Sequence, residues 1–361
     1  MPISSALSKR TAVPILLTLC LAAVGGAIFE YLRSPLPWMI GAMVVTTVAA
    51  LFGAPIQHSK KLRGYMVAVL GTMLGTAFTP ETVTDALQWG PTLGCVLIYV
   101  VIVGGVSYQI LTRVAKYDPV SSYYAAAPGG LIEMVMLGKS YGGDERVISL
   151  VHSMRLLLTV MIIPFWFRYF GGYDPSTAAA VTHGTSITPF DLGVLFVCTV
   201  VGYAGGKMLR LPAYAILGPL AVSGFVHVAG FSDARVPQDL INVAQVVLGA
   251  SIGCQFAGLA LKRVFGNLLA GGVTTIVMIA AAIAFAMIMS KVTGVDFKVL
   301  VLAFSPGGLA EMSLISLALG IDIAFVSTHH LFRVFSLLVF APIIFRLVQS
   351  FVERRKGDGR P

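Results

Sequence analysis

Charged residues are scarce in this chain. Asp, Glu, Lys and Arg make up 11% of its 361 residues, whereas hydrophobic residues make up 57% and the mean hydropathy is +0.87. Because a soluble globular domain carries about 25% charged residues, this composition excludes a soluble enzyme or a soluble binding module. It predicts an integral membrane protein.

Paired cysteines and metal-ligand spacings are also missing. The four cysteines stand singly in apolar segments, with no CxxC pair, and read as small core residues rather than disulfides or metal ligands. Six scattered histidines form no ligand cluster of the kind that copper or iron chemistry needs, which disfavours an oxygenase. We therefore expect no cofactor, no metal and no enzymatic activity.

A segment that could bind nucleic acid is absent too. The net charge of +9 comes from Lys and Arg scattered between apolar runs, the densest run being Glu353-Arg354-Arg355-Lys356. No loop is long enough for a helix-turn-helix, so direct contact with nucleic acid is not expected. Short basic clusters beside membrane spans usually set the orientation of the chain.

Long apolar runs dominate what remains. Since a span needs about 20 mostly apolar residues, the sequence predicts an all-α fold with about 10–12 transmembrane helices. The candidate spans are 13–32, 36–54, 64–80, 87–112, 119–140, 147–169, 190–209, 212–230, 240–260, 267–290, 297–320 and 323–348. The first of them could pass for a signal peptide after Lys9-Arg10, but a matching segment at 190–209 argues for a real span.

The chain repeats itself at an offset close to half its length. APGGLIEM at 127–134 matches SPGGLAEM at 305–312, and 127–170 aligned on 305–348 without gaps gives 14 identities, Glu, His and Arg among them. VLGTMLG (69–75) matches VLGASIG (247–253) at the same offset; its glycines, four apart, favour close helix packing over contact with a substrate. We predict two homologous halves. They divide the chain into an N-terminal cytoplasmic tail (1–12), a first membrane repeat (13–170), a linker (171–189), a second membrane repeat (190–348) and a basic C-terminal tail (349–361).

The orientation of the halves depends on how many segments cross the membrane. With twelve spans, Lys and Arg favour the side of the N-terminus by 16 to 7, but Lys207, Arg210, Lys262 and Arg263 fall on the opposite side. Five spans per half would invert one repeat relative to the other. We therefore favour inverted repeats with broken helices that cross at the midplane.

The repeated phrase contains a helix break followed by a carboxylate. Pro128-Gly129-Gly130 and Pro306-Gly307-Gly308 cannot continue a regular helix, and irregular backbone survives in a bilayer only when it is buried in protein or lines a wet cavity. Breaks at matching places in two repeats mark the central site of many transporters. We therefore predict a site for a substrate or ion at these two breaks.

Glu133 and Glu311 follow the two breaks, and two interpretations of them stay open. An ionisable residue in a membrane usually binds a cation or carries a proton. Alternatively, each Glu forms a fixed ion pair with the arginine of the next helix, where a His and an Arg lie on one face. These candidate site residues are His152 and Arg155 in the first half and His330 and Arg333 in the second. The arginines could also clamp a substrate carboxylate.

The paired PGGxxEM phrase, the LP…G helices and the half-length duplication resemble the bacterial AbrB-like membrane family over about residues 13–348. Its members are described as regulators of an alkylation-response gene and often as ammonia monooxygenases. The resemblance implies a multi-pass protein of the bacterial inner membrane with a link to gene regulation. More distantly, the break is similar to the crossing helix of bile-acid:sodium symporters, in the cation-antiporter and anion-transporter fold group. Glu-Met stands here where those carriers have Ser-Asn, which favours proton coupling over sodium coupling.

Two function classes follow from these observations. The first is a secondary transporter that moves or binds a small anionic or carboxylate metabolite and is coupled to protons or a cation. The second is a membrane-embedded sensor that acts indirectly on gene expression without transport. The expected partners are a small molecule or ion and the lipid bilayer, and a homodimer is a candidate assembly.

Overall fold

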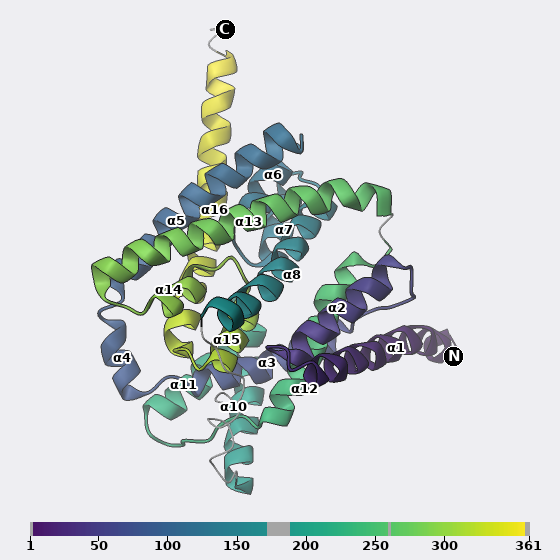
Figure 1. Cartoon of the computed structure of the whole chain (residues 1–361), viewed down its shortest axis with the longest axis vertical. Coiled ribbons are helices and arrows are strands. Elements are labelled where there is room, and N and C mark those ends of the chain that lie inside the picture. Colours follow the sequence, from purple (N-terminus) through teal and green to yellow (C-terminus); the bar gives the residue numbers. More distant parts are fainter. Residues whose placement is uncertain (1–2, 172–187, 259–260, 358–361) are drawn as a thin grey trace. The chain divides into compact units, whose positions relative to one another are not determined.

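The structure is a computed structural model that describes residues 3–171, 188–258 and 261–357, and within these residues every regular element is a helix (Figure 1). The helices of the first half are α1 (Ile3–Tyr31), α2 (Pro37–Leu51), α3 (Lys60–Gly75), α4 (Pro80–Ala86), α5 (Gly90–Gln109), the π-helix η1 (Ile110–Val114), α6 (Pro119–Ala126), α7 (Leu131–Ser140) and α8 (Glu145–Phe170). Those of the second half are α10 (Pro189–Met208), α11 (Tyr214–Val228), α12 (Gln238–Gly253), the 3-10 helix η2 (Cys254–Phe256), α13 (Leu261–Thr293), α14 (Phe297–Phe304), α15 (Leu309–Leu319) and α16 (Ile323–Gly357). The all-α prediction is confirmed.

Seven of the described helices are long and apolar enough to cross a membrane, or eight if α3 and α4, bent by 86° at their junction, count as one span. This number is lower than the 10–12 predicted. Three apolar helices, α2, α11 and α15, are shorter than a span requires. The PGG phrases also divide two apolar runs into short helices, α6 and α7 in the first half and α14 and α15 in the second.

Two helices of the structure run across predicted domain boundaries. Most of the predicted linker, residues 172–187, lies outside the described residues. Helix α1 begins at Ile3, inside the predicted N-terminal tail, and α16 continues to Gly357, inside the predicted C-terminal tail. Both tails are therefore helical extensions of the adjacent spans over the described residues.

Helix starts in the two halves keep the offset of the sequence repeat. Helices α3, α6, α7 and α8 begin at positions 60, 119, 131 and 145, and α12, α14, α15 and α16 begin at the aligned positions 238, 297, 309 and 323. The short helices α2 and α11 are both preceded by a non-glycine residue in the left-handed region, Leu36 and Ala213, each with φ of 46°. The correspondence in sequence thus extends to local backbone geometry.

The chain folds into two compact units, and each unit takes segments from both halves. Unit 1 comprises Met1–Gly90, Leu157–Val264 and Leu309–Ser327, whereas unit 2 comprises Pro91–Leu156, Phe265–Gly308 and Thr328–Pro361. The compact units therefore do not coincide with the two predicted repeats, because helices of one half pack on helices of the other.

Unit 1 is held together by helices that approach closely at glycine. Helix α3 packs on α11, and α12 packs on α2, which also contacts α1 (Figure 1). A Cβ atom added at Gly71 would overlap the main-chain carbonyl of Ile216, and one added at Gly249 would overlap that of Met39. The packing role predicted for the glycines of VLGTMLG and VLGASIG is confirmed.

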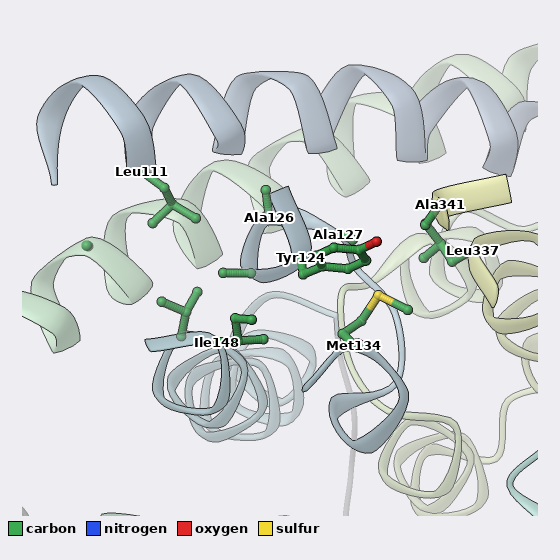
Figure 2. Close-up of a cluster of buried hydrophobic side chains, with 11 residues drawn as sticks. Leu111, Tyr124, Ala126, Ala127, Met134, Ile148, Leu337 and Ala341 are labelled. Atoms are coloured by element: carbon green, nitrogen blue, oxygen red, sulfur yellow. The ribbon is translucent and has the colours of Figure 1, made fainter. Parts of the chain in front are cut away.

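Unit 2 contains a hydrophobic cluster that surrounds the first helix break (Figure 2). Tyr124, Ala126 and Ala127 precede the break, and Met134 follows it. Further buried members come from η1, from α8 and from α16, and include Leu111, Ile148, Leu337 and Ala341. The cluster fixes the position of both helices that meet at the break.

Candidate functional site

The first PGG break is the tip of a helical hairpin. At the base of this hairpin the amide of Asp144 donates to Oγ of Ser121 at 2.6 Å, although 23 residues separate them. The rings of Tyr124 and Tyr141 stack with centroids 5.9 Å apart. Helix α7 therefore runs back along α6, and the chain returns to the side from which it came. The predicted helix break is confirmed, and at this break α6 and α7 form a hairpin, because a Pro-Gly-Gly turn can reverse a chain as well as kink it.

Two buried side chains of α8 hold the end of α6 at the tip. Nε2 of His152 lies 3.0 Å from the carbonyl oxygen of Tyr124. Arg155 donates from Nη1 to the carbonyl of Ala127 at 3.0 Å and from Nη2 to the carbonyl of Gly129 at 2.7 Å. These carbonyls belong to the last turn of α6 and to the break, where no helical amide reaches them. The cationic guanidinium also faces the negative end of the α6 dipole.

The second break repeats this arrangement at the aligned residues of the other half. Nε2 of His330 lies 2.9 Å from the carbonyl oxygen of Leu302. Arg333 donates to the carbonyls of Ser305 at 2.7 Å and Gly307 at 2.6 Å. Both arginines and both histidines are at most 2% exposed. A His and an Arg three residues apart thus satisfy the backbone at each break, and we call each set a clamp.

Both clamps lie in unit 2, near one tyrosine. Tyr99 on α5 is fully buried, in the vicinity of Arg155 and Arg333. Its ring contacts that of Phe304, which directly precedes the second break, with centroids 5.9 Å apart. Its hydroxyl donates to the carbonyl of Met278 on α13 at 3.1 Å. The fold therefore brings the two clamped breaks to the surroundings of Tyr99.

The two glutamates occupy the third position of the helices that follow the breaks. The carboxylate of Glu133 lies over Gly130, where any side chain would overlap it. It is partly exposed, whereas Glu311 is 4% exposed and belongs to unit 1. A carboxylate in the first turn complements the positive end of a helix dipole, so the first break carries a cation at the end of α6 and a carboxylate at the start of α7.

Eleven of the twelve predicted site residues lie in unit 2, and Glu311 is the exception. Pro128, Gly129 and Gly130 form the first break; Pro306, Gly307 and Gly308 form the second. Arg155 donates to two main-chain carbonyls, an arrangement that the sequence interpretation did not consider.

The sequence interpretation also missed Tyr99. A single Tyr in an apolar segment does not stand out in the sequence, and only tertiary packing brings it to the vicinity of both arginines. The carbonyl-binding role of Arg155 and Arg333 could have been predicted from the sequence. Irregular backbone in a membrane needs donors from side chains, and Arg offers five of them.

Comparison with known proteins identifies the family. The model of the family described as "Transition state regulatory protein AbrB" matches residues 38–349. The chain belongs to the AbrB family. The resemblance inferred from the PGGxxEM phrase is thereby confirmed.

Two relatives in this family match along nearly their whole length. The chain is 30% identical over 362 residues to "Uncharacterized protein YhjN" of Bacillus subtilis (strain 168), covering 94% of each chain. It is 23% identical over 332 residues to "Putative regulator AbrB" of Escherichia coli (strain K12), covering 91% of this chain and 94% of the relative. Both clamped breaks fall inside the matched region.

Proposed function

We propose that this AbrB-family protein is a secondary transporter that moves a small carboxylate-bearing anion across the bacterial inner membrane, coupled to protons or to a cation. The observation that carries the proposal is the pair of clamped breaks around Tyr99 in unit 2. Matching discontinuous helices from two repeats form the central sites of secondary transporters.

Charge near the breaks favours an anionic substrate. In unit 2, the hydrogen bonds described for Arg333 go only to neutral groups, namely two carbonyls and Nδ1 of His330. A buried cation without a carboxylate partner in its own unit attracts an anion strongly, because the surroundings screen it poorly. The N–H groups at the start of α7 add a positive helix end without a side-chain cap.

The depth of the hairpin supports a site near the middle of the bilayer. Helix α6 has 8 residues and α7 has 10, so the arms are roughly 12–15 Å long at 1.5 Å per residue. A hydrocarbon core is about 30 Å thick. A hairpin that enters from one surface therefore places its tip near the midplane.

A hairpin that re-enters also favours inverted repeats. Each half then has five spans, with α2 and α11 counted as short ones, and an odd number of spans inverts the second half. Lys207, Arg210, Lys262 and Arg263 now face the cytoplasm with the N-terminus. Apart from the buried Arg155 and Arg333, the basic residues left on the outer side are Arg33, Arg168, Arg235, Lys291 and Lys298. This distribution obeys the positive-inside rule better than twelve spans do.

Glu133 is the residue we propose for coupling, with Glu311 as its counterpart in the second half. Its carboxylate is partly exposed and lies at the tip, where a proton or cation that enters along the hairpin meets it. Neutralising Glu133 removes an anion from the start of α7 and leaves that helix end open to a substrate carboxylate. Binding of the coupling ion and of the substrate would thus support each other.

A sensor without transport is the second candidate function. One observation favours it: both arginines are engaged by the backbone, so the clamps stabilise the breaks whether or not a substrate passes. The family description and the name of the Escherichia coli relative refer to regulation. Regulation would then follow from ligand binding that changes contact with a partner protein.

Thermal unfolding of the purified protein tests the site. Wild type, Glu133→Gln and Glu311→Gln are melted with small carboxylates, amino acids, ammonium and sodium at two pH values. We expect a carboxylate to raise the Tm of wild type by mass action, with the shift lost or independent of pH in Glu133→Gln. If no compound shifts wild type and both variants merely melt lower, the glutamates are structural and the proposal fails.

A further inference from the structure

One end of unit 1 gathers tyrosines from three helices. The rings of Tyr65 on α3 and Tyr203 on α10 lie 5.9 Å apart, and those of Tyr203 and Tyr214 on α11 lie 5.3 Å apart. The side chain of Tyr65 is 53% exposed. Tyrosine is enriched where a membrane meets water, because its ring is apolar and its hydroxyl is polar.

Basic residues extend beyond these tyrosines at the same end. Thr72 and Thr199 are hydrogen-bonded at 2.7 Å further along the same two helices, so the start of α3 lies beside the end of α10. Lys60 and Lys61 precede Tyr65 by about one turn, and Lys207 follows Tyr203 by one turn; all three are exposed. Arg210 is exposed in the connection between α10 and α11. These residues and the three tyrosines form what we call the basic patch.

No acidic residue offsets the basic patch within its own chain segments. Residues 31–80 and 192–232 contain neither Asp nor Glu. Just before α3, burial together with the charges of Arg63 and Lys60 lowers the pKa of His58. The surroundings of the patch are therefore electropositive.

The other half shows that this charge is not needed to build the helix. At the aligned positions of the repeat, α12 begins with Gln238 and Asp239 in place of Lys60 and Lys61, yet it has the same length as α3. The charge of the patch could serve only to orient the chain, as basic residues often do beside spans. Orientation alone requires neither three tyrosines in contact nor basic residues drawn together from two distant segments.

We propose that the basic patch binds the phosphate headgroup of an anionic phospholipid. Clusters of Lys and Arg at the end of membrane spans attract anionic lipids. The ammonium groups of Lys60, Lys61 and Lys207 face the phosphate, while the tyrosine rings pack on the upper part of the acyl chains. Lysine stems reach along apolar surface to bring their charge to the headgroup.

Titration with lipid tests the proposal. The detergent-purified full chain is melted with increasing phosphatidylglycerol, and separately with phosphatidylcholine of the same acyl chains. We expect phosphatidylglycerol to raise Tm at lower concentrations, and the difference to shrink at high salt, which screens exposed charges. The triple variant Lys60→Gln, Lys61→Gln, Lys207→Gln should need roughly tenfold more phosphatidylglycerol, or more, for the same shift.

The matched control removes three exposed basic residues of unit 2: Arg113→Gln, Lys116→Gln and Arg146→Gln. It should respond to phosphatidylglycerol as wild type does. Tyr65→Phe serves as a second variant that keeps the charge and should weaken the response less than the triple variant. Equal shifts with both lipids, an unchanged triple variant, an equal loss in the control, or the same shift with inorganic phosphate would each overturn the proposal.

Discussion

Arg333 donates a hydrogen bond to Nδ1 of His330, 2.9 Å away and three residues earlier on α16. Nε2 of the same imidazole lies 2.9 Å from the carbonyl of Leu302, which can only accept, so Nε2 carries the proton and Nδ1 is an acceptor. In the first half, Nδ1 of His152 is buried and has no hydrogen-bond partner among the described residues. The two clamps share their contacts with the backbone, and the second adds the bond between Arg333 and His330.

The clamps predict a large effect on stability. Arg333→Gln removes two charge-assisted bonds to carbonyls and the bond to His330, and each bond to a charged group contributes about 1.5–3 kcal/mol. We expect a loss of about 3–6 kcal/mol from the two carbonyl bonds alone, with Arg333→Lys intermediate because lysine lacks the planar fork. Thermal or denaturant unfolding ranks the stabilities of wild type, Arg333→Lys and Arg333→Gln. Arg146→Gln, at an exposed position on α8, is the control; an equal, small effect at both positions would contradict the clamp.

The tip predicts that Gly130 and Glu133 act as one unit. In Gly130→Ala the new methyl group displaces the Glu133 carboxylate that now lies over residue 130. Gly130→Ala should therefore change the ligand-dependent Tm shift in the same direction as Glu133→Gln, and the double variant should show less than the sum of both changes. Gly104→Ala, on α5 with open space around it, should leave the shift as in wild type. If the changes in the Tm shift of the two single variants add up in the double variant, Gly130 and Glu133 act independently and the prediction is wrong.

The hairpin predicts which side of the membrane its ends occupy. In a chain whose four native cysteines are replaced, single cysteines at Lys116 and Ser140, both exposed, should react with a membrane-impermeant maleimide from the same side. A helix that merely kinks at the break and continues across the bilayer would expose these positions on opposite sides. Labelling of intact and inverted vesicles distinguishes the two arrangements.

The base of the hairpin predicts a local effect. Ser121→Ala removes the acceptor for the amide of Asp144, a bond that should contribute about 0.5–1.5 kcal/mol. Hydrogen exchange at the start of α8 should become faster, while exchange in α1 and α2 of unit 1 should not change. Ser140→Ala is the comparison, since Oγ of Ser140 bonds only to a carbonyl in its own helix. No change in exchange near Asp144 would show that the bond does not hold the hairpin.

Local sequence was sufficient to predict the helix breaks. Pro128-Gly129-Gly130 forbids a continuous helix by its covalent structure alone, and the family resemblance was read from the same phrase. The close packing at Gly71 and Gly249 could be predicted because each has a second glycine four residues later, Gly75 and Gly253, on the same helix face.

Contacts between residues far apart in the chain could not be predicted from the sequence. Whether the chain continues past Gly130 or turns back depends on the contact between Ser121 and Asp144, 23 residues apart. A buried Arg155 needs hydrogen-bond acceptors, and the sequence alone does not distinguish a carboxylate from a main-chain carbonyl in this role. The carbonyls of Ala127 and Gly129 reach Arg155 because α6 runs beside α8, a path that only the tertiary fold determines.

Uptake by proteoliposomes tests the central claim most directly. The carboxylate that stabilises the purified protein is labelled and offered to vesicles that contain wild type, Glu133→Gln or no protein, with and without a proton gradient. The proposed function predicts gradient-dependent accumulation with wild type and its loss with Glu133→Gln. Binding to wild type without uptake above empty vesicles would contradict transport and leave the protein a sensor.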